Sequence, residues 1–148
     1  MSKPPALNAL FDPAAVAVVG ASPEPSKPGG RCLALLRKYG YPGSVYPINP
    51  KYASIGGLRC YPDFASLTSP IDLVVLLVPA NSVAAYLRAA AQAGARAAIV
   101  CSSGFAEAGP SGVELQRELV DIARNSRIAV LGPNCLGLID LEHRLVAS

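Results

Sequence analysis

The segment AVAVVGASPEPSKPGGR, residues 15–31, decides the fold class of this chain. Its first part is a run of small and β-branched apolar residues that ends at Gly20. A proline-rich loop with one lysine follows and leads to Gly29 and Gly30. A buried strand that enters a glycine-bounded turn is typical of a Rossmann phosphate-binding turn, although the spacing G-x-G-x-x-G is absent.

Similar apolar runs recur along the chain at intervals of about 25–30 residues, which is the length of one βαβ unit. Their apolar character is continuous rather than alternating, as in strands that are buried on both faces of a parallel sheet. The sequence therefore predicts an α/β fold with a doubly wound parallel sheet, Rossmann-like in type. The five expected strands are Val16–Gly20, Ser44–Ile48, Ile71–Val78, Arg96–Cys101 and Arg127–Leu131.

Helical patterns lie between most of these strands. One helix is expected over Arg31–Tyr39, with Gly40 after its last turn. A second is expected to begin at a cap formed by Asn81 or Ser82 and to end at Gly94. A third opens at Ser111, where Glu114 stands at capping-box spacing. Between the second and third strands only Asp63–Leu67 favours a short helix.

Composition and charge exclude several classes of protein. The 148 residues suit one domain, and 51% hydrophobic against 16% charged residues argues against disorder. Thirteen basic and ten acidic residues are scattered, so no nucleic-acid patch is expected. No apolar run has the length of a membrane span or a signal peptide, and we expect a cytoplasmic protein.

The four cysteines, Cys32, Cys60, Cys101 and Cys135, show no C-x-x-C pair and no Cys/His ligand spacing. We therefore predict reduced thiols and no metal site. The expected organisation is an N-terminal extension over residues 1–13, a domain over 14–140, and over 141–148 the start of a truncated connection to a further domain.

The carboxyl ends of the five strands are the expected ligand site, because ligands bind there in doubly wound sheets. Each end combines a small residue or proline with a hydrogen-bonding group. No histidine and no pair of carboxylates occurs there, so the site is predicted to bind a ligand without acid–base catalysis. The ends are Gly20-Ala21-Ser22, Asn49-Pro50-Lys51, Val78-Pro79-Ala80, Ser102-Ser103-Gly104 and Gly132-Pro133-Asn134.

The loop after the first strand has two interpretations. Ser22 offers a hydroxyl, Lys27 offers a charge, and the helix that starts at Gly29-Gly30 offers free amides to a phosphate. The alternative is an ordinary strand–helix turn that its prolines stiffen.

The end of the second strand separates the possible ligands. An NAD site places Asp or Glu there for the ribose hydroxyls, whereas this chain has Lys51. A lysine suits the additional ribose phosphate of NADP or coenzyme A, or it is a solvated loop residue. Small residues at Val78-Pro79-Ala80 leave room for a flat group, and Ser102 and Ser103 could bind an amide or only shape their turn.

Three further side chains have the chemistry of possible catalysts. Glu107 is the only acid near a strand end, and His143 lies in the charged tail LEHR. Cys135 is a nucleophile by position or a structural thiol, and no base stands beside it in sequence. No catalytic residue is predicted.

Five short motifs occur in order at compatible spacings: VAVVGAS (16–22), YPINPK (46–51), DLVVLLVPA (72–80), IVCSSGFAEAG (99–109) and LGPNCLG (131–137). Together they resemble the N-terminal CoA-binding domain of NDP-forming acyl-CoA synthetases. This is the ADP-forming acetate–CoA ligase type, related to the succinyl-CoA synthetase alpha subunit. The resemblance covers about residues 14–140.

The resemblance implies that coenzyme A or an acyl-CoA binds at the strand ends. It implies phosphate contacts by Ser22 and the loop 23–30, a CoA contact by Lys51, and the thiol end near Gly132-Pro133-Asn134. In the family the reaction runs through a phosphohistidine in a second, flavodoxin-like domain, and an ATP-grasp domain binds the nucleotide. The motifs quoted above contain neither domain. We therefore expect those domains as partners in cis or trans, and no complete catalysis by these 148 residues.

Two other functions remain open from the sequence. The first is a regulatory domain that senses CoA or acyl-CoA, either free or fused to a GNAT acetyltransferase. The second is an NADP-binding domain, against which the missing G-x-G-x-x-G and the LGPNCLG ending argue.

Overall fold

A five-stranded parallel sheet forms the centre of the molecule, and the computed structural model describes residues 5–148 around it. The strand order is β2-β1-β5-β6-β7. All five predicted strands are confirmed, each within a few residues of its expected bounds. The strands are β1 (Ala15–Val19), β2 (Ser44–Ile48), β5 (Leu73–Leu76), β6 (Ala97–Val100) and β7 (Ala129–Leu131).

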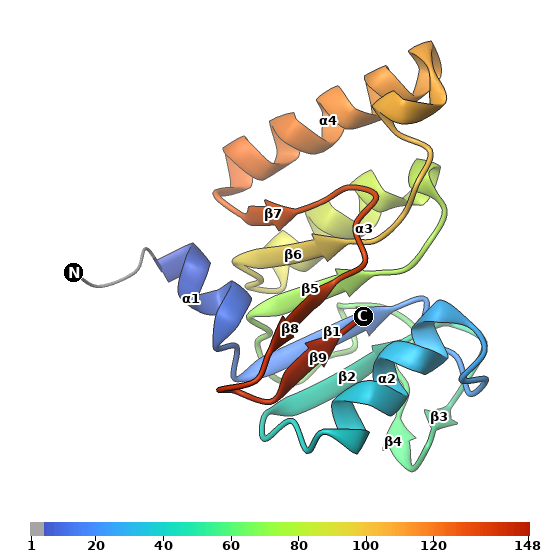
Figure 1. Cartoon of the computed structure of the whole chain (residues 1–148), viewed down its shortest axis with the longest axis vertical. Coiled ribbons are helices and arrows are strands. Elements are labelled where there is room, and N and C mark those ends of the chain that lie inside the picture. The colour runs from blue at the N-terminus through green and yellow to red at the C-terminus, as the bar shows by residue number, and fades with distance from the viewer. Residues whose placement is uncertain (1–4) are drawn as a thin grey trace.

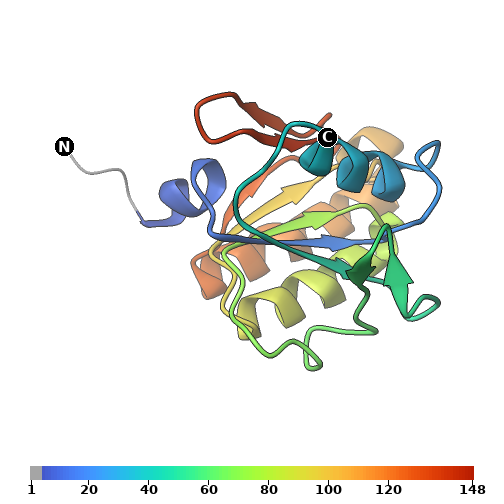
Figure 2. The same ribbon diagram turned by 90° about the horizontal axis from the view of Figure 1, so that it is seen from below.

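The sheet lies between two layers, as Figures 1 and 2 show. One face is covered by α2 (Pro28–Lys38), α1 (Pro5–Phe11) and a C-terminal hairpin, the other by α3 (Ala80–Gln92) and α4 (Pro110–Ser126). The chain changes faces between β1, which leads into α2, and β5, which leads into α3. The doubly wound prediction is therefore confirmed, with the topological switch point between β1 and β5.

Strand β1 shows why the apolar runs are continuous. Val16 and Val18 pack in the core on the side of α2, while Ala17 and Val19 pack on the side of α3 and α4. All four are at most 1% exposed. Burying a valine side chain contributes about 1.5–3 kcal/mol, so both faces of the sheet stabilise the fold.

Two predicted helix caps are wrong. Helix α3 begins at Ala80, directly after Pro79, and no side chain caps it. Pro79 has extended backbone geometry, so the helix starts before Asn81 or Ser82 could act. Helix α4 follows Gly109, and Glu114 forms an ion pair with Arg117 instead of closing a capping box.

The segment between β2 and β5 contains a small hairpin that the sequence analysis did not predict. It consists of β3 (Ser54–Ile55) and β4 (Leu58–Arg59). Gly56 and Gly57 both have positive φ, 58° and 84°, which fits a two-residue type I′ turn. The short helix expected at 63–67 is wrong, because the Asp63 carboxylate accepts hydrogen bonds from the Ser66 amide and hydroxyl and fixes a turn there.

A second unpredicted hairpin closes the described chain. It consists of β8 (Leu138–Asp140) and β9 (Leu145–Ala147), and it packs beside α2. Leu145 and Ala147 have no exposed surface. The hairpin fills the face that α2 and α1 leave uncovered, and the short 3₁₀ helix η1 (Ala106–Ala108) completes the elements. Within residues 5–148, no helix is long and apolar enough to cross a membrane.

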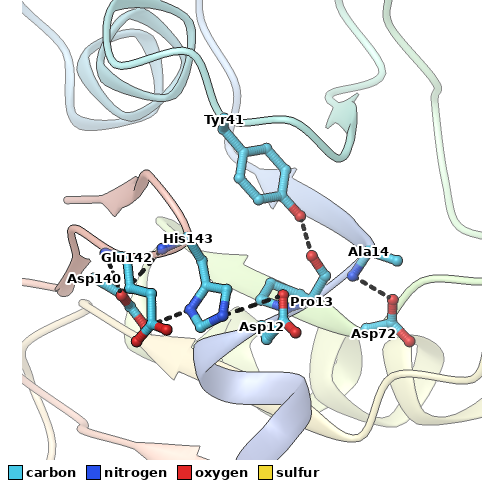
Figure 3. A network of polar contacts seen from close by, with 8 residues as sticks. All are labelled: Asp12, Pro13, Ala14, Tyr41, Asp72, Asp140, Glu142 and His143. Atoms are coloured by element: carbon cyan, nitrogen blue, oxygen red, sulfur yellow. Dashed lines mark hydrogen bonds and ion pairs between the residues drawn. The ribbon is translucent and has the colours of Figure 1, made fainter.

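A polar network fixes the start of β1 at the amino-end edge of the sheet (Figure 3). The Asp72 carboxylate accepts hydrogen bonds from the amides of Ala14 and Ala15, each at 3.0 Å. The Tyr41 hydroxyl donates to the carbonyl of Pro13. Burial and then the charge of Asp72 raise the pKa of Tyr41 to about 12, so this hydroxyl remains a donor.

His143 connects the turn of the C-terminal hairpin to the N-terminal helix in the same network (Figure 3). Its Nδ1 lies 2.9 Å from Asp140 Oδ2, and its Nε2 lies 3.7 Å from Asp12 Oδ1. The hydrogen bond with Asp140 raises the pKa of His143 and lowers that of Asp140. The ring therefore supports the hairpin, at the edge opposite to the predicted ligand site.

The burial of Leu145 predicts that the hairpin contributes to global stability. We expect Leu145→Ala to lower the free energy of unfolding by about 2–5 kcal/mol, because it leaves a cavity under α2. Leu141→Ala is the matched control, since Leu141 is 78% exposed and its loss should cost no more than about 0.5 kcal/mol. Urea denaturation measures both. Equal effects of the two substitutions would show that the hairpin does not pack as described.

The His143–Asp140 contact predicts a pH dependence of stability. Because the folded state raises the pKa of His143, its contribution is complete below the unfolded value of about 6.5 and is lost as pH rises through the folded value. The Asp140 contribution is lost only in acid, as pH falls through its lowered pKa. We expect the stability difference between wild type and His143→Gln to shrink as pH rises from about 6.5 through the raised folded pKa of His143. A difference that stays constant over this window would contradict the assignment.

Candidate functional site

The carboxyl ends of the five strands form one edge, and its centre is the switch point between β1 and β5. Gly20 ends β1 with φ 81°, and a β-carbon there would lie 2.2 Å from the carbonyl oxygen of Leu77. The exits of the two strands are therefore in backbone contact. Only glycine fits at this position, because its backbone conformation and the close approach both exclude a side chain.

Hydrogen bonds join the predicted ends of β1 and β2. Asn49 Nδ2 donates to the carbonyl of Ala21 at 2.9 Å, and Asn49 Oδ1 accepts the amide of Lys51 at 2.9 Å. The Asn49 side chain thus holds two loops in place, whereas the sequence analysis treated it as a direct ligand contact. Lys51 is exposed, and no ion pair to it forms within residues 5–148.

The ends of β5, β6 and β7 are joined in the same way. The Ser102 hydroxyl donates to the carbonyl of Val78, and the backbone N–H of Asn134 donates to the carbonyl of Ser102 at 3.0 Å. Ser103 and Asn134 are exposed, and their side chains make no hydrogen bond to any other described residue. The structure therefore brings these predicted residues together and leaves two polar side chains free to contact a ligand.

The predicted phosphate loop is folded tightly against the first turn of α2. β-Carbons at Gly29 and Gly30 would lie 1.9 Å from the Gly20 carbonyl oxygen and 2.0 Å from that of Glu24. Ser22 is 6% exposed, and its hydroxyl accepts the amide of Glu24 at 3.1 Å. The amides of Gly29 and Gly30 have no acceptor among the described residues, as expected in a first helical turn.

Glu24 is a charged residue of this loop whose role the sequence analysis did not predict. Its carboxylate lies 2.7 Å from Lys27 Nζ, and both side chains are more than half exposed. The hydrogen bond and charge of Glu24 raise the pKa of Lys27. The Lys27 charge is thereby partly offset, so Lys27 contributes less to an anion site than its sequence position suggests. The signal was available in the three-residue spacing of the two side chains.

Glu107 holds the turn after β6. Its Oε1 accepts the amides of Gly104 at 2.6 Å and Phe105 at 3.1 Å, and the first of these bonds lowers its pKa most. Glu107 therefore positions Ser103 and Gly104. A carboxylate engaged in this way remains charged at neutral pH and is a poor proton donor.

The thiols near the edge are structural. Burial raises the pKa of Cys32 and of Cys101 to about 12, so both remain protonated. The Cys135 thiol donates to the carbonyl of Val100 at 3.4 Å. These contacts favour the interpretation of Cys135 as a structural thiol over its interpretation as a nucleophile.

A large groove lies beside this edge rather than along it. It has a volume of about 1080 Å³ and runs between α2, β2 and the β3–β4 hairpin. Of the predicted residues, only Ser22 and three residues of the loop 23–30 (Pro23, Pro25 and Gly30) line it. Residues 55–58 of the hairpin form one side of the groove. We place the candidate site at the strand ends, because ligands bind there in doubly wound sheets.

Comparison with known proteins identifies the family of the chain. The model of a family described as CoA binding domain matches residues 14–140. An ADP-forming acetate–CoA ligase I of Archaeoglobus fulgidus is 40% identical over 96% of this chain, which covers 20% of that protein. The alpha subunit of an ADP-forming acetate–CoA ligase I of Pyrococcus furiosus is 36% identical over 96% of this chain, which covers 32% of that subunit.

A solved structure extends the likeness to three dimensions. The dinucleotide forming acetyl-coenzyme A synthetase 1 of Ca. Korarchaeum cryptofilum, in complex with phosphate and ADP, superposes with a TM-score of 0.92 at 41% identity. The match covers 98% of this chain and 31% of that one. The present chain thus spans about a fifth to a third of the length of these relatives.

Proposed function

This chain belongs to the CoA-binding domain family, and we propose that it binds coenzyme A across the carboxyl-end edge of its sheet as one part of an ADP-forming acyl-CoA ligase. The observation that supports the proposal most is the joined set of strand ends at the switch point, with free amides at one end and free polar side chains at the other. Its relatives include ADP-forming acetate–CoA ligases and a trans-feruloyl-CoA synthase.

The proposed ligand lies with its phosphates at the loop after β1. The amides of Gly29 and Gly30, with the positive end of α2, would bind the diphosphate. Lys51 would contact the adenosine phosphate at the end of β2. The remaining contacts would come from Gly20, Ala21, Ser22, Lys27, Asn49, Pro50, Val78, Pro79, Ala80, Ser102, Ser103, Gly104, Pro133 and Asn134.

The thiol end of CoA would then lie near Asn134, where this chain offers hydrogen bonds and no acid–base pair. In the reaction we infer, the thiol sulfur attacks the carbonyl carbon of an acyl phosphate, and the carbon–oxygen bond to phosphate breaks. Phosphate leaves, and the thiol proton passes to it or to solvent. We infer that other domains form the acyl phosphate. Such domains could lie on the same chain, as the greater length of the Archaeoglobus ligase allows, or on a second subunit, as the name of the Pyrococcus alpha subunit suggests.

The proposal includes a phosphohistidine domain and an ATP-grasp domain as those partners, and a cytoplasmic location. All four cysteines are free, which suits a reducing compartment. A CoA-sensing role without ligase activity, with or without a GNAT acetyltransferase, is the alternative. The open reading frame that encodes the chain distinguishes the two by what it specifies beyond residue 148.

Lys51 provides the test of ligand and orientation. We expect the wild-type chain to bind CoA in isothermal titration calorimetry, and Lys51→Gln to weaken CoA about 5- to 10-fold through loss of a charge-assisted hydrogen bond to phosphate. Dephospho-CoA should be bound equally by both proteins. Lys38→Gln, which removes a cation from the far end of α2, is the control and should bind CoA as the wild type does.

Failure of wild-type binding, with NADP bound in its place, would contradict the CoA assignment. Equal weakening of CoA and dephospho-CoA by Lys51→Gln would leave CoA binding intact and refute the role of Lys51.

A further inference from the structure

The β3–β4 hairpin is fixed beside the turn that carries Lys51. The backbone N–H of Asn49 donates to the carbonyl of Tyr61, and the backbone N–H of Tyr61 donates to the carbonyl of Pro47, both at 2.9 Å. Ile48 and Tyr61 form a parallel bridge at the end of β2. Tyr61, two residues after β4, therefore holds the separate β3–β4 hairpin beside the carboxyl end of β2, where Figure 1 shows it.

The tip of the hairpin is anchored as well. Arg37 on α2 donates from its guanidinium to the carbonyl of Gly56 at 3.0 Å. The Cys60 amide donates to the carbonyl of Ala53 at 2.9 Å and holds the base of the hairpin. A segment held at both ends presents its side chains in a defined position, which lowers the entropy lost when a ligand binds.

Arg59 is the cation on this hairpin. Its guanidinium lies 4.9 Å from the centre of the Tyr61 ring, and the Tyr61 ring packs edge-on against Tyr46 at 5.8 Å. A guanidinium stacked on a ring keeps its in-plane N–H donors available. No ion pair joins Arg59 to a carboxylate within residues 5–148.

The chain segment that carries Arg59 has two cations and no acid of its own. Residues 46–62 include Lys51 and Arg59 and contain no Asp or Glu. The next acid, Asp63, is engaged with Ser66 through the two hydrogen bonds of its turn. The Lys51 ammonium is a point charge, and the Arg59 guanidinium is planar and can donate two parallel hydrogen bonds. Together they suit a phosphate monoester better than a diphosphate diester, because a monoester dianion carries more charge on its phosphorus and has three free oxygens.

We propose that Arg59, held on the Tyr61 ring, is a specificity-determining residue that binds the 3′-phosphate of CoA together with Lys51. The inference rests on the proposed function, because it assumes that the adenosine part of CoA lies at the end of β2. It adds a residue outside the strand ends and gives the hairpin a role in distinguishing CoA from dephospho-CoA.

Titration of CoA and dephospho-CoA into wild type and Arg59→Gln tests the proposal. We expect Arg59→Gln to weaken CoA about 10-fold or more and to leave dephospho-CoA unchanged, because only the 3′-phosphate loses its partner. Arg59→Lys should restore part of the preference, since it keeps the charge and loses the fork. Arg124→Gln removes an exposed cation from α4 and should change neither affinity.

The salt dependence of CoA affinity separates a direct contact by Arg59 from a purely structural role, which would leave this dependence unchanged. The CoA affinity of Arg59→Gln should fall less steeply with added salt than that of wild type, while the urea midpoints stay alike. Equal loss for both ligands, or no loss, would overturn the role of Arg59 even though the wild type binds CoA. Absence of CoA binding by the wild type would overturn the proposed function itself.

Discussion

The carbonyl oxygen of Gly20 lies where a β-carbon at residue 29 would have to be, and this contact sets the geometry of the candidate site. It arises because β1 and β5 are adjacent while their helices leave to opposite faces of the sheet. The loop after β1 must then fold back against the first turn of α2, and backbone meets backbone there. Glycine at positions 20, 29 and 30 is the consequence, and the free amides of the helix come to lie at the edge of the sheet.

From this contact the rest of the edge follows by hydrogen bonds between neighbouring strand ends. Asn49 connects the loops after β1 and β2, and Ser102 connects those after β5 and β6. Such cross-links make a rigid edge that is rich in donors and poor in proton-transfer groups. An edge of this kind suits the proposed role of binding a large phosphorylated ligand without supplying the acid–base groups.

The sheet was predictable because its signal is local, a continuous apolar run for every buried strand. The strand ends followed from the same runs, so the candidate residues were found by position. What each side chain does there was less accessible. Asn49 and Glu107 position loops, and Lys27 is paired with Glu24, because tertiary neighbours decide these roles.

The two hairpins were missed for different physical reasons. The Gly56-Gly57 turn was visible in the sequence, but its strands of two residues each are too short to show alternation. The β8–β9 hairpin is determined by the vacant space beside α2, which no local pattern reveals. The caps of α3 and α4 failed similarly, since Pro79 and Gly109 set the helix starts through backbone geometry.

Amide chemical shifts recorded by NMR during titration of the chain with CoA test the central claim most directly. The account predicts that the largest changes fall on Ser22, Gly29, Gly30, Lys51, Ser103 and Asn134, at the carboxyl ends of the strands. Changes confined to groove residues away from the strand ends, such as Leu33, Arg37 and Ile55, or to the opposite edge around Asp12 and His143, would contradict it.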